Sequence, residues 1–139
     1  MTKTLEEWIK FYEQKAKVKY EPPDKRVKQF YFPDRGFAEI GASKNMVIIH
    51  QMCGDAKFWK NVAEVLAMQL GINHLGTWCI RKIEPYIRFF GVEIERVEDL
   101  GEGLKRYHGK LKDTGKNAVF TPNFRAKNGN IGYLVTWEI

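Results

Sequence analysis

Hydrophobic and polar residues recur along the chain with two different periods, and the change of period marks the elements that we expect. Over Leu5–Lys17 the apolar side chains follow helical spacing, and Thr4 and Glu7 have the spacing of a capping box. Pro22 and Pro23 follow, and proline does not continue a helix because it lacks an amide hydrogen. The pattern therefore predicts an amphipathic helix. Its apolar face consists of Leu5, Trp8, Ile9, Phe11 and Tyr12.

Three short β-rich runs come next, separated by turn-forming groups at residues 33–36 and 43–45. The runs are Val27–Phe32, Phe37–Ala42 and Met46–Cys53. Because the connections are short, this pattern predicts an antiparallel meander.

A second helix is predicted from Lys57 to about Leu70, with Gly71 as its C-terminal stop. The positions expected to form its core-facing stripe are Phe58, Trp59, Val62, Val65, Leu66 and Leu70.

The rest of the chain alternates strand patterns with one short helix over Glu84–Phe90, which Gly91 closes. The strand candidates are Leu75–Arg81, Val92–Val97, Leu104–His108, Ala118–Thr121 and Ile131–Ile139, with a turn signal at Lys127-Asn128-Gly129-Asn130. This order predicts an α/β (α+β) fold with a mixed central β-sheet and flanking helices.

With 139 residues, 44% hydrophobic and 29% charged, the chain has the composition of one globular domain and lies far from disordered sequences. We divide the expected single domain 1–139 into an N-terminal helix and connection (1–26), a meander and core (27–97) and C-terminal antiparallel strands (98–139). No apolar run is long enough to span a membrane, and the first residues lack the apolar core of a secretion signal. We therefore expect a soluble, cytoplasmic protein without membrane association.

Charge and cysteine content indicate which kinds of ligand and cross-link to expect. Lys and Arg outnumber Asp and Glu by 23 to 17, giving a net charge of +6 that favours an anionic ligand or partner. Two cysteines are too few for a disulfide framework. His50, Cys53, His74 and Cys79 lack the paired spacing typical of zinc ligands, so no metal site is expected.

One strand–loop–helix segment has the features of an anion site. The strand over 46–50 leads into the loop Gln51–Ala56 and then into the helix that begins at Lys57, whose first amides lack partners within the helix. Gly54 permits close backbone approach of a phosphate. A structural interpretation stays open, in which Asp55 caps the helix and Gly54 only makes the turn.

The sequence Gln51-Met52-Cys53-Gly54-Asp55-Ala56 resembles the Gln/Arg-x-x-Gly-x-Gly/Ala signature with which members of the GNAT N-acetyltransferase-like superfamily hold the pyrophosphate of acetyl-CoA. The segment Cys79–Val92 is similar to the family's strand and short helix, which end in an aromatic–Gly–Phe step. The two blocks cover roughly Met46–Val97, about a third of the chain. The resemblance implies an acyl-CoA-dependent N-acyltransferase that transfers an acetyl group to an unidentified amine.

The resemblance also implies which residues contact the coenzyme, in a gap between the strands at 46–53 and 75–81. The backbone of His50, Gln51 and Met52 would face the pantetheine arm, and the amides of Gly54, Asp55, Ala56 and Lys57 would face the pyrophosphate.

Amine acylation needs a base, and Glu39 and His50 are the two candidates, either of them acting through water. Glu39 lies on the strand before the signature strand, and histidine exchanges protons near neutral pH. The family's usual acid is a tyrosine at the position of Ile87, and Tyr86 is one residue off register, which turns a helical side chain by roughly 100°. Whether the chain is active therefore stays open.

An alternative is a non-catalytic GNAT-like module that binds a protein or a nucleic acid. The residues expected to contact a phosphate backbone are Lys105, Arg106, Lys110 and Lys112, with Tyr107 available to stack on a base. A GNAT-like domain with a basic rim is also similar to small phage-associated acyltransferase-like proteins, including the Mom family that modifies DNA bases.

Overall fold

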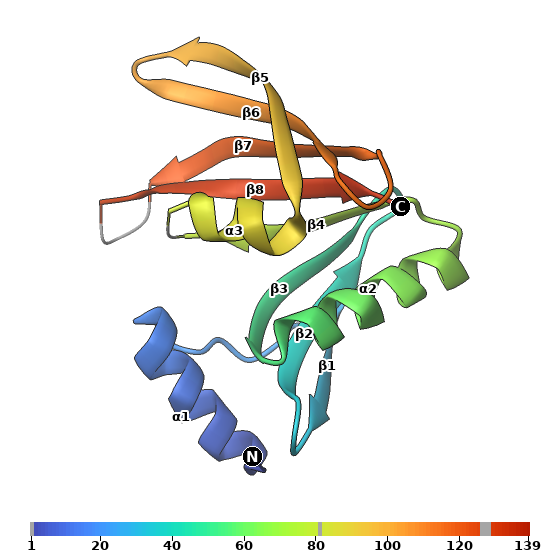
Figure 1. Cartoon of the computed structure of the whole chain (residues 1–139). Helices are drawn as coiled ribbons and strands as arrows, with labels where there is room; N and C mark the ends of the chain where they lie inside the picture. The colour runs from blue at the N-terminus through green and yellow to red at the C-terminus, as the bar shows by residue number, and fades with distance from the viewer. Residues whose placement is uncertain (1, 81, 126–128) are drawn as a thin grey trace. The chain divides into compact units, whose positions relative to one another are not determined.

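The computed structural model describes residues 2–80, 82–125 and 129–139, and across these residues the chain forms three helices and eight strands, an α+β fold (Figure 1). It divides into two compact units, Met1–Ile72 and Asn73–Ile139. Arg81, expected at the end of a strand, and Lys127 and Asn128, expected in a turn, lie outside the described residues. No helix in the described ranges is long and apolar enough to cross a membrane.

The first unit begins with helix α1, Leu5–Ala16, and its predicted capping box is confirmed. Thr4 Oγ1 accepts from the amide of Glu7 at 3.2 Å, and Glu7 Oε1 accepts from the amide of Thr4 at 2.9 Å. These two bonds satisfy amides that no helical carbonyl reaches. The helix ends at Lys17, which adopts a left-handed conformation.

The predicted antiparallel meander follows, as strands β1 (Val27–Phe32), β2 (Gly36–Ala42) and β3 (Val47–Gly54). Helix α2, Ala56–Leu70, comes next and stops at Gly71, whose φ of 71° is the left-handed conformation that glycine adopts without strain. The boundaries of the predicted elements are therefore nearly correct in this unit.

The two faces of the meander pack against different helices. Phe37 and Cys53 lie with Trp8 of α1 in one cluster of buried residues, on what we call the α1 face. The alternate residues of β2, Ala38 and Ile40, are also buried and point to the opposite α2 face. Figure 1 shows α1 in blue and α2 in green on either side of these strands. Both surfaces of the meander are thus covered by a helix.

The predicted core-facing stripe of α2 is partly wrong. The residues of α2 that are buried are Trp59, Ala63 and Ala67, whereas Val65 and Leu70 are 47% and 59% exposed. A face built on two alanines lets the helix approach the sheet closely, and the apolar residues Val65 and Leu70 stay partly outside this contact.

The second unit contains β4 (His74–Cys79), helix α3 (Glu84–Phe90) and four further strands. These are β5 (Val92–Gly101), β6 (Leu104–Leu111), β7 (Asn117–Arg125) and β8 (Ile131–Glu138). They form an antiparallel arrangement in the order β4-β8-β7-β6-β5. The strands β5, β6 and β7 extend beyond their predicted ends, because backbone pairing continues where the apolar pattern has stopped.

One face of the second unit's strands is apolar and the other carries both polar and apolar side chains. Phe90 of α3 packs on Trp137 with ring centroids 4.7 Å apart, beside the buried Phe120 and Val135. The alternate residues of the same strands form the mixed face, where His108 on β6 pairs with Val119 on β7.

Candidate functional site

A buried carboxyl group lies between the strands of the first unit. Glu39, in the middle of β2, has only 1% of its surface exposed. Its Oε1 accepts from Gln51 Nε2 at 2.8 Å, and its Oε2 accepts from Gln29 Nε2 at 3.3 Å. Gln29 on β1 and Gln51 on β3 are the cross-strand partners of Glu39, so the three side chains share one face. The register of the meander builds this group.

The phenol of Tyr20 completes what we call the Glu39 cluster, which consists of Tyr20, Gln29, Glu39 and Gln51. Tyr20 Oη accepts from Gln29 Nε2 at 2.6 Å and also forms a hydrogen bond with the Glu39 carboxyl. Burial raises the pKa of Tyr20 well above its usual value, and the bond to Glu39 acts in the same direction. The phenol therefore keeps its proton and donates it, and the three hydrogen-bond partners of Glu39 are all neutral.

Gln51, the first residue of the signature, is anchored on both ends of its amide. Besides the bond to Glu39, its Nε2 donates to the Glu21 backbone oxygen at 2.7 Å, and its Oε1 accepts from the Glu21 amide at 3.3 Å. No buried side-chain nitrogen or oxygen in the described ranges lacks a hydrogen-bond partner. The Gln51 side chain thus fixes the connection before β1 to the sheet.

The pairing of β2 with β3 is irregular at His50. Glu39 pairs with Gln51 whereas the next residue of β2 pairs with Ile49, so His50 is an extra residue on β3. Such bulges re-aim side chains and are frequent beside active sites. A Cβ built on Gly41 would lie 3.1 Å from His50 Nε2, and Gly41 shares the Glu39 face because it is two residues along β2. The exposed imidazole of His50 therefore lies on the same face as the Glu39 cluster.

The loop expected to cradle a pyrophosphate is held by its own residues. The Asp55 amide donates to the Arg35 backbone oxygen at 2.9 Å, and the Asp55 carboxylate accepts from the amides of Phe58, at 3.1 Å, and Lys57. The bond from Phe58 and then that from the Arg35 side chain lower the pKa of Asp55. The expectation that the Asp55 amide is available to a ligand is wrong, and the interpretation in which Asp55 caps the helix is confirmed.

Gly54 is required by the neighbouring strand. Its φ is 104°, and a Cβ at this position would lie 2.2 Å from the Arg35 backbone oxygen. Gly36, its partner on β2, is equally constrained, since a Cβ there would lie 2.0 Å from the Cys53 oxygen. The close backbone approach attributed to a phosphate is made here by β2.

The other residues expected at the coenzyme follow along the same connection. Met52 pairs with Ala38 across β2 and β3, Ala56 is the first residue of α2, and Lys57 is exposed in the first turn. Tyr86, the candidate acid, belongs to the second unit, where it is half-buried on α3.

The basic residues expected to contact nucleic acid do not form one stripe. Lys105 and Arg106 are consecutive on β6 and so point to opposite faces, while Lys110 shares the face of Arg106. Arg106 Nη1 lies 3.1 Å from Glu98 Oε1, so its charge is partly neutralised. Lys112 lies beyond the end of β6.

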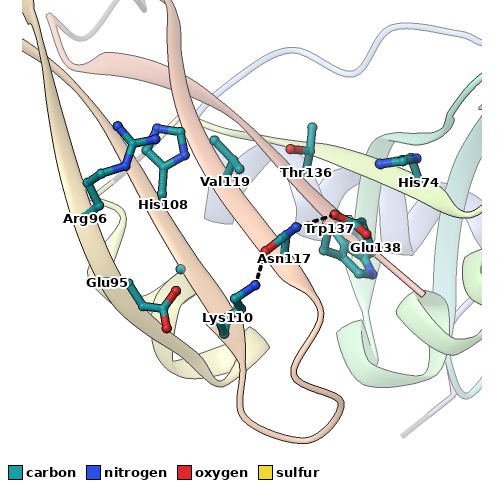
Figure 2. Close-up of a pocket in the computed structure, with 11 residues that line it drawn as sticks. His74, Glu95, Arg96, His108, Lys110, Asn117, Val119, Thr136, Trp137 and Glu138 are labelled. Carbon is teal, nitrogen blue, oxygen red and sulfur yellow. Dashed lines mark hydrogen bonds between the residues drawn. The ribbon is translucent and has the colours of Figure 1, made fainter.

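A polar hollow of about 380 Å³ lies on the same face as Arg106 (Figure 2). Figure 2 shows a hydrogen-bonded row across three strands, in which Lys110 Nζ donates to Asn117 Oδ1 at 2.6 Å and Asn117 Nδ2 donates to Glu138 Oε1 at 2.8 Å. Arg96 and Glu95 also line the hollow. Because both signs of charge alternate here, the hollow does not form a continuous positive surface.

The described ranges contain no group of three or more His, Cys, Asp or Glu side chains placed to hold a metal ion. Comparison with protein-family models, with curated proteins and with solved structures finds no match to this chain.

Proposed function

We propose that the chain is an acyl-CoA-dependent N-acyltransferase that transfers an acetyl or other acyl group to an amine. The observation that carries the proposal is the position of the exposed His50, on a bulge beside the buried Glu39 cluster, in the strand that leads into the signature loop. The resemblance of residues 51–56 and 79–92 to the GNAT N-acetyltransferase-like superfamily supplies the reaction class.

In this reaction the amine nitrogen forms a bond to the thioester carbonyl carbon, and the bond from that carbon to sulfur breaks. The amine must lose a proton and the departing thiolate must gain one. We assign the first transfer to His50, because its imidazole is exposed on the face that carries the cluster. The departing thiolate is proposed to take its proton from solvent.

Glu39 is proposed as a positioning residue, in contrast to the expectation that it acts as a base. Its carboxyl is 1% exposed and accepts from three neutral donors, so a substrate does not reach it without displacing them. Through Gln51 it holds the residue that follows His50 on β3. The cluster thereby maintains the bulge that presents the imidazole.

Coenzyme binding at the start of α2 is proposed to compete with Asp55. The amides of Lys57 and Phe58 donate to the Asp55 carboxylate, so they are able to bind an anion. The carboxylate occupies the position that a pyrophosphate would need. A diphosphate has to take over the amides of Lys57 and Phe58 while Asp55 stays paired with Arg35. We therefore expect acetyl-CoA to bind more weakly than to a loop with an uncharged residue at this position.

Titration with acetyl-CoA tests the proposal, with thermal unfolding and calorimetry as readouts. Binding is expected below about 1 mM, which raises the unfolding temperature by mass action. Lys57→Glu should weaken it about tenfold by placing a like charge at the diphosphate. Lys44→Glu is the matched control, since this exposed lysine lies at the other end of β3. No binding at several millimolar coenzyme refutes the proposal.

Activity is measured as thiol release from acetyl-CoA with a panel of primary amines that includes a lysine peptide and a polyamine. His50→Gln should lower kcat about 10²-fold or more, the usual range for a lost general base, while leaving the affinity for acetyl-CoA within about twofold. Equal activity of His50→Gln and the unchanged chain removes His50 from the mechanism.

The alternative, a non-catalytic module that binds a protein or nucleic acid, is favoured by one observation: the start of α2 is already capped by a carboxylate. It predicts no coenzyme affinity in either the unchanged chain or an Asp55→Asn variant. For a nucleic acid it further predicts binding that weakens steeply with salt and on Lys110→Glu.

A further inference from the structure

The α2 face of the first unit carries a groove of about 410 Å³ that the proposed reaction does not use. It lies between the last turns of α2 and the strands of the meander. The residues that line it are Lys25, Arg26, Val27, Lys28, Phe30, Ile40, Gly41, Ala42, Val47, Leu66 and Leu70.

The floor of the groove lies on the opposite face of the meander from Glu39. Lys28 and Ile40 are cross-strand partners, as are Ala42 and Val47, and these residues alternate with Glu39 along the strands. Because consecutive side chains point to opposite faces, Ile40 faces the groove while Glu39 faces α1. A ligand on this floor would lie across the strands from Glu39, whereas Val27 and Gly41, which also line the groove, lie close to His50.

The floor and one wall of the groove are apolar, and this apolar surface continues onto α2. Leu66 and Leu70, one turn apart, form the helical wall, and Leu70 is 59% exposed. Met68, which does not line the groove, is 62% exposed and lies roughly 160° or more around the helix from both leucines. Removing exposed apolar surface of this kind from water lowers the free energy of the system. This favours an apolar chain as the occupant of the groove.

The rim of the groove is cationic. Lys25, Arg26 and Lys28 are among the lining residues and no Asp or Glu is. Arg26 is partly compensated, since its Nη2 lies 3.6 Å from Asp24 Oδ2. Lys28 lies on the same strand face as Ile40 of the apolar floor, so it adds a positive charge beside that floor.

We propose that this groove binds a single-chain anionic amphiphile of the fatty-acid type, with its alkyl chain along Leu66, Leu70 and Ile40 and its carboxylate at Lys28. The volume lies in the range of small-ligand sites and suits one chain. The apolar floor selects the chain, and the cationic rim selects the anionic head. This site is independent of the acyltransfer reaction.

A chain-length series tests the proposal by calorimetry on the full chain, with octanoate, decanoate and dodecanoate below their micellar concentrations. Affinity should rise about fourfold for each added methylene, the fold-change that corresponds to about 0.8 kcal/mol per buried methylene, and level off when the groove is full. Alcohols of the same length should bind about fivefold or more weakly, because they lack the charge that meets Lys28.

Two pairs of variants distinguish binding in the groove from non-specific binding to other exposed apolar surface. Leu70→Asp should weaken decanoate binding at least about tenfold, by removing apolar wall and repelling the carboxylate. Met68→Asp, an equally exposed substitution in the same helical turn, should change it less than about twofold. Lys28→Glu should weaken decanoate binding more than the control Lys44→Glu does, because the carboxylate is proposed to lie at Lys28.

Several outcomes overturn the proposal: affinity that does not depend on chain length, equal loss in Leu70→Asp and Met68→Asp, or binding only to anionic phospholipid vesicles and not to decanoate. The last result would identify the end of α2 as a membrane-contact surface. Acetyl-CoA binding and thiol release are measured on the same variants and should be unchanged. Failure here and failure of the acyltransferase proposal are thus distinguishable.

Discussion

Replacing Glu39 by Gln is the most direct perturbation of the Glu39 cluster. A carboxylate is an acceptor only, and its two oxygens receive bonds from Gln51, Gln29 and Tyr20. In the variant one oxygen becomes an amide nitrogen. Whichever way this new amide is turned, its nitrogen faces the amide nitrogen of Gln51 or of Gln29, so two donors oppose each other.

The cost follows from the bonds that are lost. Gln51 cannot turn its amide around, because that would break both of its bonds to Glu21, at 2.7 and 3.3 Å. Turning the amide of Gln29 would reverse its 2.6 Å bond with Tyr20, because the hydroxyl would then have to donate to Gln29 Oε1 and could no longer donate to residue 39. In either arrangement at least one hydrogen bond of the cluster is lost or reversed, which costs about 1–3 kcal/mol of unfolding free energy. We expect Glu39→Gln to lower that free energy by about 2 kcal/mol.

Urea unfolding followed by tryptophan fluorescence measures this change, and Glu6→Gln on the exposed side of α1 is the control for removing a carboxylate. Tyr20→Phe alone should lower the unfolding free energy by about 1 kcal/mol. A double-mutant cycle should give a coupling of at least about 0.5 kcal/mol, because the two residues share a bond. An unfolding free energy of Glu39→Gln within about 0.5 kcal/mol of the unchanged chain would refute an acceptor-only carboxyl in the cluster.

Three further changes test other parts of the structure. Gly54→Ala should lower the unfolding free energy by about 3 kcal/mol, because its Cβ would meet backbone, whereas Gly103→Ala, with a positive φ but open space, should lower it by about 1 kcal/mol in urea unfolding. Asp55→Asn keeps the capping oxygen and removes the charge, so calorimetry should show acetyl-CoA binding about fivefold or more tightly; unchanged affinity contradicts the proposed competition. Hydrogen bonds from His108 and then Arg106 lower the pKa of Glu98 below its usual 4.5, so its contribution to stability is present above that pH and is lost as pH falls through the lowered pKa. Glu98→Gln should therefore flatten the acid limb of a stability profile below pH 4.5, and an unaltered limb would count against this pairing.

Much of the fold was predictable from local signals. Thr4 with Glu7 identified the start of α1, and Gly71 and Gly91 identified the ends of α2 and α3. Such signals depend on side chains and backbone groups within one turn of each other. The face of α2 that is buried was not predictable in the same way. Ala63 and Ala67 are buried because of the strand surface on which the helix packs, and that surface comes from residues outside the helix.

The residues of the candidate site were likewise only partly predictable from the sequence. Glu39 and His50 were chosen from the sequence for their chemistry, but their separate roles follow from burial and from the bulge in β3. Gln29 and Tyr20 carried no signal of their own, because an ordinary glutamine and tyrosine become partners of a carboxyl only when three strands align.

The sequence by itself therefore determined the order of the helices and strands, the ends of the helices and which residue types bear reactive groups, because these depend on neighbours along the chain. Only the tertiary structure decided that the Arg35 backbone would approach Gly54. It also decided that Asp55 would cap α2 while forming an ion pair with the Arg35 side chain. It also decided that Leu70 would be exposed beside a groove with a cationic rim. Each of these facts requires contact between segments distant in sequence, which register and packing create and no local pattern encodes.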